Sequence, residues 1–505
     1  MGIVGTLVKS AIEVNHKINL DKQDPVTQQL EQLEYLLKKA ENTAFGKYYG
    51  FHEMLKSKNV IAAFQQEVPL HDYEQMQFWW KQQQKTKDVS WPGKPSYFAL
   101  TSGTTGKKSK RIPITEELSE SMKKVGVSLT SSLPNFDLPE SLFESQVLML
   151  SSSADLAKHK HGFLEGEISG INIHNFPDWY ELFYRPGKDI AAINDWDKRV
   201  AAIAKEAPNW NIGAIAGIPS WVLMMLKEVI RVNKLNYIQD IWPNFQLFAS
   251  GGVAFETYRK DFEKISNRDL TILDTYLASE GFFAYTPRPG TTSMKLALSH
   301  GYFYELIPFD DRGVNEHGEI LENPEIISLS EIERDQEYVL IISSCAGAWR
   351  YKIGDTIKFT DTATFEFKIT GRTKFFLNVV GSQLSEEKMD ETIIDLANEL
   401  NVSINEYMVS AVKNEEGEYI HQWVLVSNDT LNENEVVEKL DQKLKERNNN
   451  YAVAREKALK GIALKIISKE QYSNYLEKTK KKGGQVKTPK VMKATKMKKL
   501  LDVLD

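Results

Sequence analysis

Apolar side chains recur at helical spacing in several parts of the chain. Between residues 26 and 40, Leu30, Leu33, Leu37 and Ala40 fall on one face of a helix, while glutamine, glutamate and lysine occupy the rest. That distribution is typical of an amphipathic helix whose apolar stripe packs against a core. Comparable patterns predict further helices at residues 116–127, 217–229, 385–400 and 433–447.

Short apolar runs alternate with these helical stretches. Bounded by turn residues, they predict strands at 147–150, 245–248, 270–276, 302–309 and 338–343. The alternation indicates an α/β fold. Further on, the runs 407–412 and 419–426 flank an acidic turn and predict a hairpin in a smaller α+β unit. We therefore expect a large N-terminal α/β domain, residues 1–370, and a smaller C-terminal α+β domain, residues 371–505.

The composition narrows the class of protein. The chain has 505 residues, 42% of them hydrophobic, and a formal net charge of -6, which gives no global reason to bind nucleic acid. Its one cysteine, Cys345, cannot form an intramolecular disulfide or a cysteine-rich zinc cluster. No stretch is apolar and long enough to cross a bilayer. We expect a cytoplasmic protein that acts on small molecules, without nucleic acid or a membrane as a partner.

One loop concentrates the groups that bind phosphate. The apolar run Tyr97 to Leu100 leads into Thr101-Ser-Gly-Thr-Thr-Gly-Lys-Lys-Ser-Lys110, where glycines let backbone N–H groups approach an anion that hydroxyls and lysines also bind. Only two residues separate Gly103 from Gly106, so the loop is not a Walker A motif. The alternative is a solvated polar turn.

Three further motifs follow this loop at the ends of predicted strands. Gly251 and Gly252 let the backbone lie close to a flat ligand such as adenine. Glu280 offers hard oxygen ligands for a magnesium ion beside ATP phosphates. Asp355, placed beyond a predicted glycine turn, can accept hydrogen bonds from two ribose hydroxyls. Each motif alone also fits an ordinary turn or a solvated carboxylate. Their order behind the loop is the one that adenylating enzymes use.

The chain resembles the Gretchen Hagen 3 (auxin-responsive) acyl acid amido synthetases, a family of the acyl-adenylate-forming superfamily. The resemblance covers nearly the whole chain. Its motifs are 42–51, 68–74, Trp91-Pro92-Gly93-Lys94, the Ser102–Lys107 loop, 276–283, 302–308, 350–355 and Lys487-Thr488-Pro489-Lys490. It implies an enzyme that uses ATP and Mg²⁺ to activate a carboxylic acid as acyl-AMP and then transfers the acyl group to the amine of an amino acid.

The resemblance also implies roles for individual residues. It gives catalytic lysines, Lys107 and Lys487, a metal ligand, Glu280, and a hinge at Lys374 about which the C-terminal domain pivots. The residues that it implies for nucleotide binding are Ser102, Gly103, Thr104, Thr105, Gly251, Gly252, Tyr276, Ser279, Asp355 and Arg372. Because the segment 478–499 is rich in lysine, Lys482 and Lys490 stay alternatives to Lys487.

Departures from the family pattern leave the substrates open. Ala278 stands where a second serine is usual, Trp349 where leucine is frequent, and Lys490 where arginine is frequent. None of these changes removes a charge that the chemistry needs. The acyl acid and the amine are not identified by the sequence. Two other functions stay possible: an acyl-CoA synthetase, which delivers the acyl group to a thiol, and a non-catalytic protein that binds a nucleotide or an acyl acid.

Overall fold

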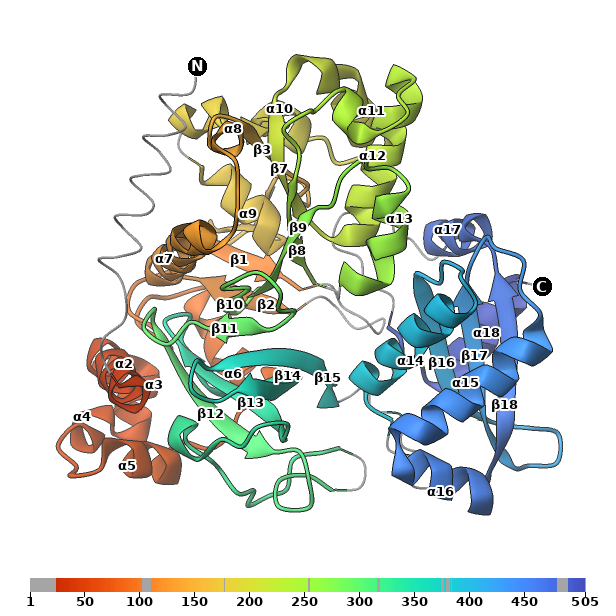
Figure 1. Ribbon diagram of the computed structural model, residues 1–505. Coiled ribbons are helices and arrows are strands. Elements are labelled where there is room, and N and C mark those ends of the chain that lie inside the picture. Colours follow the sequence, from red (N-terminus) through yellow and green to blue (C-terminus); the bar gives the residue numbers. More distant parts are fainter. Residues whose placement is uncertain are drawn as a thin grey trace.

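The chain folds into a larger N-terminal part and a smaller C-terminal part, each built on its own sheet (Figure 1). This arrangement in a mixed α/β protein confirms the predicted fold class. The computed structural model describes residues 24–101, 110–176, 178–252, 255–315, 318–373, 377, 382, 384–478 and 489–504. Among the helices in those ranges, none has both the length and the apolar character needed to span a membrane.

An 11-stranded mixed sheet runs through the larger part. Its strands, in spatial order, are β12 (Tyr302–Pro308), β13 (Glu337–Ser344), β14 (Ala348–Asp361), β15 (Glu366–Arg372), β11 (Met294–Leu296), β10 (Gly281–Tyr285), β9 (Thr271–Ala278), β8 (Leu247–Gly251), β7 (Ile212–Gly217), β3 (Gln146–Met149) and β6 (Tyr184–Arg185). The strands from β6 to β9 pair in parallel, and the others are antiparallel. The predicted strands are present, although the one expected at 245–248 begins at Leu247.

Helices cover the two faces of the parallel half. On one face, apolar residues of α11 (Trp196–Glu206), α12 (Pro219–Asn233) and α13 (Arg259–Glu263) form a core with Ile215 and Phe248. On the other lie α7 (Glu116–Ser132), α8 (Glu140–Phe143) and α9 (Ile168–His174) (Figure 1). The short α10 (Lys188–Ala191) packs against α9 and α11. The predicted helices at 116–127 and 217–229 are confirmed, and α7 continues five residues further, to Ser132.

The N-terminal helices pack on the antiparallel half. They are α2 (Pro25–Ala40), α3 (Ala44–Tyr49), α4 (Phe51–Met54), α5 (Val60–Glu67) and α6 (Tyr73–Gln83). The apolar stripe expected for 26–40 is buried at Leu33 and Leu37, and α6 buries Trp80 against β14. Cys345 lies in the same core, where burial raises the pKa of its thiol to about 12.

A second, four-stranded sheet carries the ends of the phosphate loop. Its order is β2 (Arg111–Ile114), β1 (Tyr97–Leu100), β5 (Leu164–Gly166) and β4 (Ala157–Lys158). Strands β1 and β2 are antiparallel neighbours, and the Thr101 amide donates to the carbonyl of Lys110 at 3.2 Å. The two ends of the loop are therefore held side by side.

The smaller part is a three-stranded sheet with helices around it. Its elements are β16 (Glu406–Lys413), β17 (Tyr419–Val426), β18 (Leu459–Ile467), α14 (Glu386–Glu399), α15 (Glu433–Arg447), α16 (Asn449–Lys457), α17 (Lys469–Lys478) and α18 (Ala494–Leu504). The predicted hairpin is the antiparallel pair β16 and β17. The Ser385 hydroxyl accepts from the Lys388 amide at the start of α14, as expected for an N-cap. The predicted helix at 433–447 is α15.

One local prediction is wrong. The sequence predicts a glycine turn within residues 350–355, just before Asp355, but these residues lie inside the long strand β14. Gly354 has a φ of 91° and stands where the pairing of β13 with β14 shifts register. The reason is that polar and apolar residues alternate through this segment, as they do in a strand. The glycine therefore accommodates an irregularity within the strand rather than ending it.

Candidate active site

A cleft of about 3640 Å³ brings the predicted site residues together. It is lined by the ends of the central strands, by Thr101 and Lys110 at the two ends of the phosphate loop, and by residues of the smaller part. The predicted residues that line it are Gly251, Gly252, Tyr276, Ser279, Glu280, Asp355 and Arg372. The others, Ser102, Gly103, Thr104, Thr105, Lys107, Lys374 and Lys487, lie outside the described residues.

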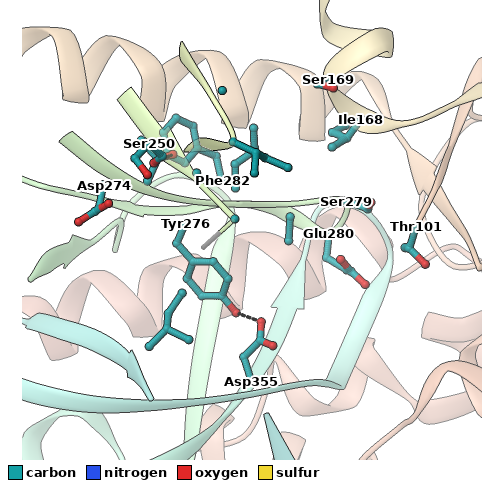
Figure 2. Close-up of a pocket in the computed structure, with 18 of the residues that line it drawn as sticks. Thr101, Ile168, Ser169, Ser250, Asp274, Tyr276, Ser279, Glu280, Phe282 and Asp355 are labelled. Atoms are coloured by element: carbon teal, nitrogen blue, oxygen red, sulfur yellow. Dashed lines mark hydrogen bonds between the residues drawn. The ribbon is translucent and has the colours of Figure 1, made fainter. Parts of the chain in front are cut away.

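Asp355 is held from two sides. The Tyr276 hydroxyl, from β9, donates to Asp355 Oδ2 at 2.5 Å (Figure 2). Arg372 Nε, from β15, donates to Oδ1 at 2.6 Å, and the negative charge of Asp355 raises the pKa of the arginine. Only 10% of the Asp355 side chain is exposed. The carboxylate is therefore fixed in the cleft with free lone pairs that can accept from two vicinal hydroxyls.

Glu280 is buried close to this pair. It follows β9 in the turn to β10 and is 7% exposed, and this burial raises the pKa of its carboxyl group, although the charges of Lys110 and Arg372 oppose the shift. Burial raises the pKa of the neighbouring Tyr351 hydroxyl, and the Glu280 carboxylate adds to this shift both through its charge and as a hydrogen-bond partner. The site therefore places one buried carboxylate beside a buried tyrosine hydroxyl.

This donor set fits a magnesium ion that arrives with a nucleotide. Among the described residues, no group of three or more histidine, cysteine, aspartate or glutamate side chains could hold a metal by itself. Magnesium commonly takes one or two carboxylates and completes its shell with phosphate oxygens and water. Glu280 can supply such a ligand at this place. The described histidines His159 and His161 belong to no such group either.

A second acid of the cleft, the half-buried Asp274, was not identified from the sequence. It pairs in register with Ser250 across β8 and β9, lines the cleft, and stands two residues before Tyr276 (Figure 2). Burial and the nearby Glu256 raise the pKa of Asp274 to about 7. Gly252, with a φ of 86°, directly follows β8, the strand that pairs with the Asp274 strand β9. Together these residues offer a flat backbone surface beside a hydrogen-bonding carboxyl group.

The raised pKa of Asp274 predicts a pH dependence of stability. The folded chain keeps this proton up to about pH 7, whereas the unfolded chain loses it near pH 3.8, so raising the pH between these values favours unfolding. The free energy of unfolding of the wild type should fall relative to that of Asp274→Asn by up to ~1.4 kcal/mol per pH unit in this window. Urea unfolding at several pH values measures this difference. Parallel pH profiles for the two proteins would contradict the assignment.

Lys490 is held by carboxylates of the smaller part. Its Nζ lies 2.7 and 2.6 Å from the two carboxylate oxygens of Asp390 and 3.2 Å from Glu386 Oε1. Burial alone would lower the pKa of this lysine, but the two acids outweigh it and raise the pKa. Residues 490–492 extend the sheet by pairing with Val409 of β16. In this arrangement the Lys490 ammonium group stabilises the smaller part.

Known protein families match three segments in the expected order. Residues 14–204 match the GH3 family N-terminal domain, residues 295–372 the GH3 family central domain, and residues 387–496 the GH3 family C-terminal domain. The chain belongs to the GH3 family. The resemblance found in the sequence motifs is thereby confirmed.

Individual GH3 relatives are distant in sequence. The chain is 25% identical over 287 residues to the indole-3-acetic acid-amido synthetase GH3.4 of Arabidopsis thaliana, an alignment that covers 52% of this chain and 47% of that protein. The chain thus spans about half the length of the curated relatives that it matches. The structure of AtGH3.15 acyl acid amido synthetase in complex with 2,4-DB superposes with a TM-score of 0.75 at 15% identity, covering 96% and 97% of the two chains.

The fold extends beyond the GH3 family. A 2-hydroxyisobutyryl-CoA ligase, in the postadenylation state with 2-HIB-AMP, superposes with a TM-score of 0.59 at 10% identity, covering 94% of this chain and 90% of the ligase. At such low identity these matches establish the shared fold. This GH3 chain and the ligase therefore have the same fold.

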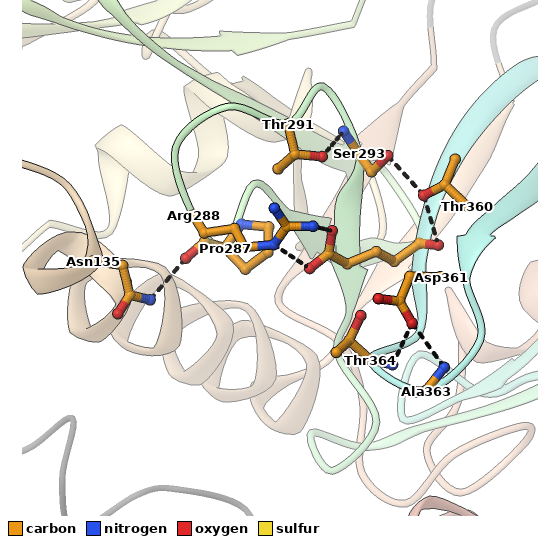
Figure 3. A network of polar contacts seen from close by, with 10 residues as sticks. Asn135, Pro287, Arg288, Thr291, Ser293, Thr360, Asp361, Ala363 and Thr364 are labelled. Carbon is orange, nitrogen blue, oxygen red and sulfur yellow. Dashed lines mark hydrogen bonds and ion pairs between the residues drawn. The ribbon is translucent and has the colours of Figure 1, made fainter.

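In a second, smaller cavity of the GH3 chain, the lining side chains bond to one another. This hollow of about 450 Å³ lies beside the β14–β15 hairpin. In it Arg288 forms two hydrogen bonds, at 3.0 and 2.9 Å, with the buried Glu366, and the Thr360 hydroxyl donates to Ser293 at 2.8 Å (Figure 3). The main charges at this place are already paired within the protein. This network therefore braces the hairpin.

Proposed function

We propose that this GH3 chain is an ATP-dependent acyl acid amido synthetase. The observation that supports this function best is the fixed Asp355 carboxylate, held by Tyr276 and Arg372 and placed near the buried Glu280 in one cleft. A ribose acceptor near a candidate magnesium ligand is what an adenylating site requires. The ends of the phosphate loop line the same cleft, so the triphosphate would lie between Glu280 and that loop.

In the proposed reaction, different residues of the cleft bind different parts of the nucleotide. Asp355 accepts from the ribose hydroxyls, and the backbone at Gly251 and Gly252, with Tyr276, lies against the adenine. Glu280 would hold Mg²⁺, which when bound neutralises phosphate charge. Ser102, Gly103, Thr104, Thr105 and Lys107 are proposed to hold the phosphates, and Ser279 to bind the nucleotide next to Glu280. Lys487 is proposed to approach the reacting carboxylate and phosphate.

Two displacement steps then give the amide. The carboxylate oxygen of the acid attacks the α-phosphorus, the bond between the α-phosphorus and the bridging oxygen breaks, and pyrophosphate leaves. An amino acid amine then attacks the acyl carbon, loses a proton and expels AMP as the new C–N bond forms. Alignment of the reactants and electrostatic stabilisation of the phosphates supply the catalysis. No covalent bond to a protein side chain is needed.

We further propose that the chain divides into domains 1–370 and 371–505 and that the second pivots at Lys374 between the two steps. Polar contacts between the two parts support this proposal. Lys469 Nζ lies 2.5 Å from Asp261 Oδ2, Lys264 Nζ donates to Ser403 Oγ at 2.9 Å, and the Tyr258 hydroxyl donates to Glu406. Such polar interfaces are easily exchanged for others.

Two alternative functions make different predictions for the product. An acyl-CoA synthetase has support from the fold shared with the 2-hydroxyisobutyryl-CoA ligase. A non-catalytic binding protein would use the same cleft without turnover. We propose a cytoplasmic location with small carboxylic and amino acids as partners. The single, buried Cys345 is compatible with a reducing compartment.

The test is acid-dependent release of pyrophosphate in the presence of ATP and Mg²⁺. A panel of aryl, indolyl and aliphatic acids should be run with mixed amino acids, with CoA and with neither. We expect release with at least one acid, and a product amide, identified by mass, that forms with amino acids and not with CoA. A CoA thioester would favour the first alternative. ATP binding without release for every acid would favour the second.

A further inference from the structure

One face of the parallel half of the sheet is hollow beneath its covering helices. Central strands of a parallel sheet usually bury both faces. Here Ile215 and Phe248 are fully buried on the face that α11 and α12 cover. On the other face, three alanines are only half-buried and line the cleft: Ala214, Ala216 and Ala249. The small side chains in the middle of the sheet leave the space open. The same alternation occurs in β3.

The helix opposite this face also leaves room. Gly126 of α7 lines the cleft, and a Cβ atom added to it would meet no atom within 4 Å. Further along α7, Leu129, and Leu133 just after the end of that helix, line the cleft and pack with residues of α8 and of the sheet. We call this section of the cleft the acyl channel. Its wall is formed by Gly126, Leu129 and Thr130 on one side and by Ala214, Ala216 and Ala249 on the other.

The inner end of the acyl channel is closed by leucines. Leu133, Leu142, Leu247 and Leu273 belong to one buried apolar cluster. The outer end reaches Gly251 and therefore the proposed nucleotide site. Gly251 and Leu247 are four residues apart in β8. At the rise per residue of a strand, the distance between them along the channel is about 13 Å. The channel is thus longer than a short acid requires.

Polar groups in the channel wall are already bonded within the protein. The hydroxyl of Thr130 donates to the Gly126 carbonyl at 2.9 Å, that of Ser145 to the Ser141 carbonyl at 2.6 Å, and that of Thr275 to the Ser250 carbonyl at 2.9 Å. Lys123, one turn before Gly126 on α7, is a charged residue that also lines the cleft. On α7, the charged pair Glu120 and Lys123, bonded to each other at 2.7 Å, lies toward the N-terminal end of the helix.

We propose that the acid activated by this chain is a monocarboxylic acid with a long, uncharged, apolar tail. This inference rests on the proposed function. The carboxylate would lie at the Gly251 end, and the tail would run along β8 toward Leu247. Burial of a hydrocarbon tail against such an apolar wall is favourable. The wall provides no countercharge for a second carboxylate, which would stay unpaired in an apolar site. A straight alkyl chain, or an alkyl chain with an apolar ring, has this chemistry.

The experiment compares straight-chain acids from butanoic to tetradecanoic acid with the corresponding dicarboxylic acids. For acid-dependent pyrophosphate release, kcat/KM should rise about fourfold per added methylene until the channel is filled, and dicarboxylic acids should be poor substrates. In Gly126→Leu, whose new side chain fills the channel, the ratio of kcat/KM for decanoic to butanoic acid should fall at least about tenfold. Lys124→Leu, on an exposed position of the same helix, should keep the wild-type ratio.

Binding measurements separate this inference from the proposed function. If no acid releases pyrophosphate but calorimetry finds decanoic acid binding that Gly126→Leu weakens and Lys124→Leu does not, the proposed function fails and the channel assignment holds. Pyrophosphate release that does not depend on chain length, a preference for dicarboxylic acids, or absence of both release and binding would overturn the channel assignment. If Gly126→Leu does not fold, Gly126→Ala replaces it, with a smaller drop of the same ratio expected.

Discussion

Replacement of Glu280 by glutamine should lower the rate of pyrophosphate release by about 10²–10³-fold. The amide keeps the size of the side chain but removes the negative charge that the proposed magnesium ion requires. Because burial raises the pKa of Glu280, the folded chain disfavours its ionised form. The free energy of unfolding at neutral pH should therefore stay the same or increase. Steady-state kinetics and urea unfolding measure the two effects.

The matched control for this variant is Glu319→Gln. Glu319 is an exposed carboxylate that also lines the cleft, so the same substitution removes a charge of equal sign without removing the buried one. We expect its rate to stay within a few-fold of the wild type. Equal losses in the two variants would mean that the general negative charge of the cleft matters, and Glu280 would lose its assigned role.

Replacement of Glu305 by glutamine should lower the free energy of unfolding by about 3–5 kcal/mol. Glu305 and Arg350 form a buried ion pair in which both side chains are almost inaccessible, with exposures of 2% and 3%. Arg350 Nε lies 3.0 Å from Glu305 Oε2, and its NH1 group donates to the carbonyls of Val68 and Gln65 at 2.6 and 2.7 Å. Without Glu305 the guanidinium group would keep these carbonyls but lose its countercharge. Urea unfolding measures the loss.

An exposed ion pair on α12 provides the control for this loss. Glu228 and Arg231 are 2.6 Å apart, and 71% of the arginine side chain is exposed. Glu228→Gln should cost less than about 1 kcal/mol, because water and salt screen such pairs. Arg350→Lys should fall between the two, since a lysine keeps the charge but cannot reproduce the planar contacts. If Glu305→Gln costs no more than Glu228→Gln, the buried pair does not stabilise the sheet in the way argued.

The sequence predicted those elements whose side chains repeat with a clear period. Leu33 and Leu37 mark the buried stripe of α2, and the cap at Ser385 marks the start of α14, because both signals are local. The strand β14 was missed as a continuous element, because Gly354 was interpreted as a turn. A glycine has the same neighbours in sequence whether the chain turns there or a continuous strand only shifts its pairing register. The strand that pairs with this segment decides between the two outcomes.

The candidate site was predicted residue by residue, but its contacts were not. Asp355 was expected to bind a ribose, yet its partners come from β9 and β15, and Arg372 is placed there by the register in which it faces Asp355. Register depends on the whole sheet and is not encoded near either residue. Asp274 was overlooked because an acid in a strand has the same local pattern whether it faces water or a protein interior. The clamp on Lys490 likewise depends on residues of α14, distant in sequence.

The buried position of Cys345 makes the chain suitable for site-specific labelling. Thiol reagents attack the thiolate, and a thiol with a pKa of about 12 that is 1% exposed supplies almost none. Because the chain has no other cysteine, cysteines introduced at exposed positions would be its only reactive thiols. One label at Arg231, whose side chain is 71% exposed in the larger part, and one at the exposed Lys457 in the smaller part would report the distance between the two parts with and without ATP, with the native sequence otherwise unchanged.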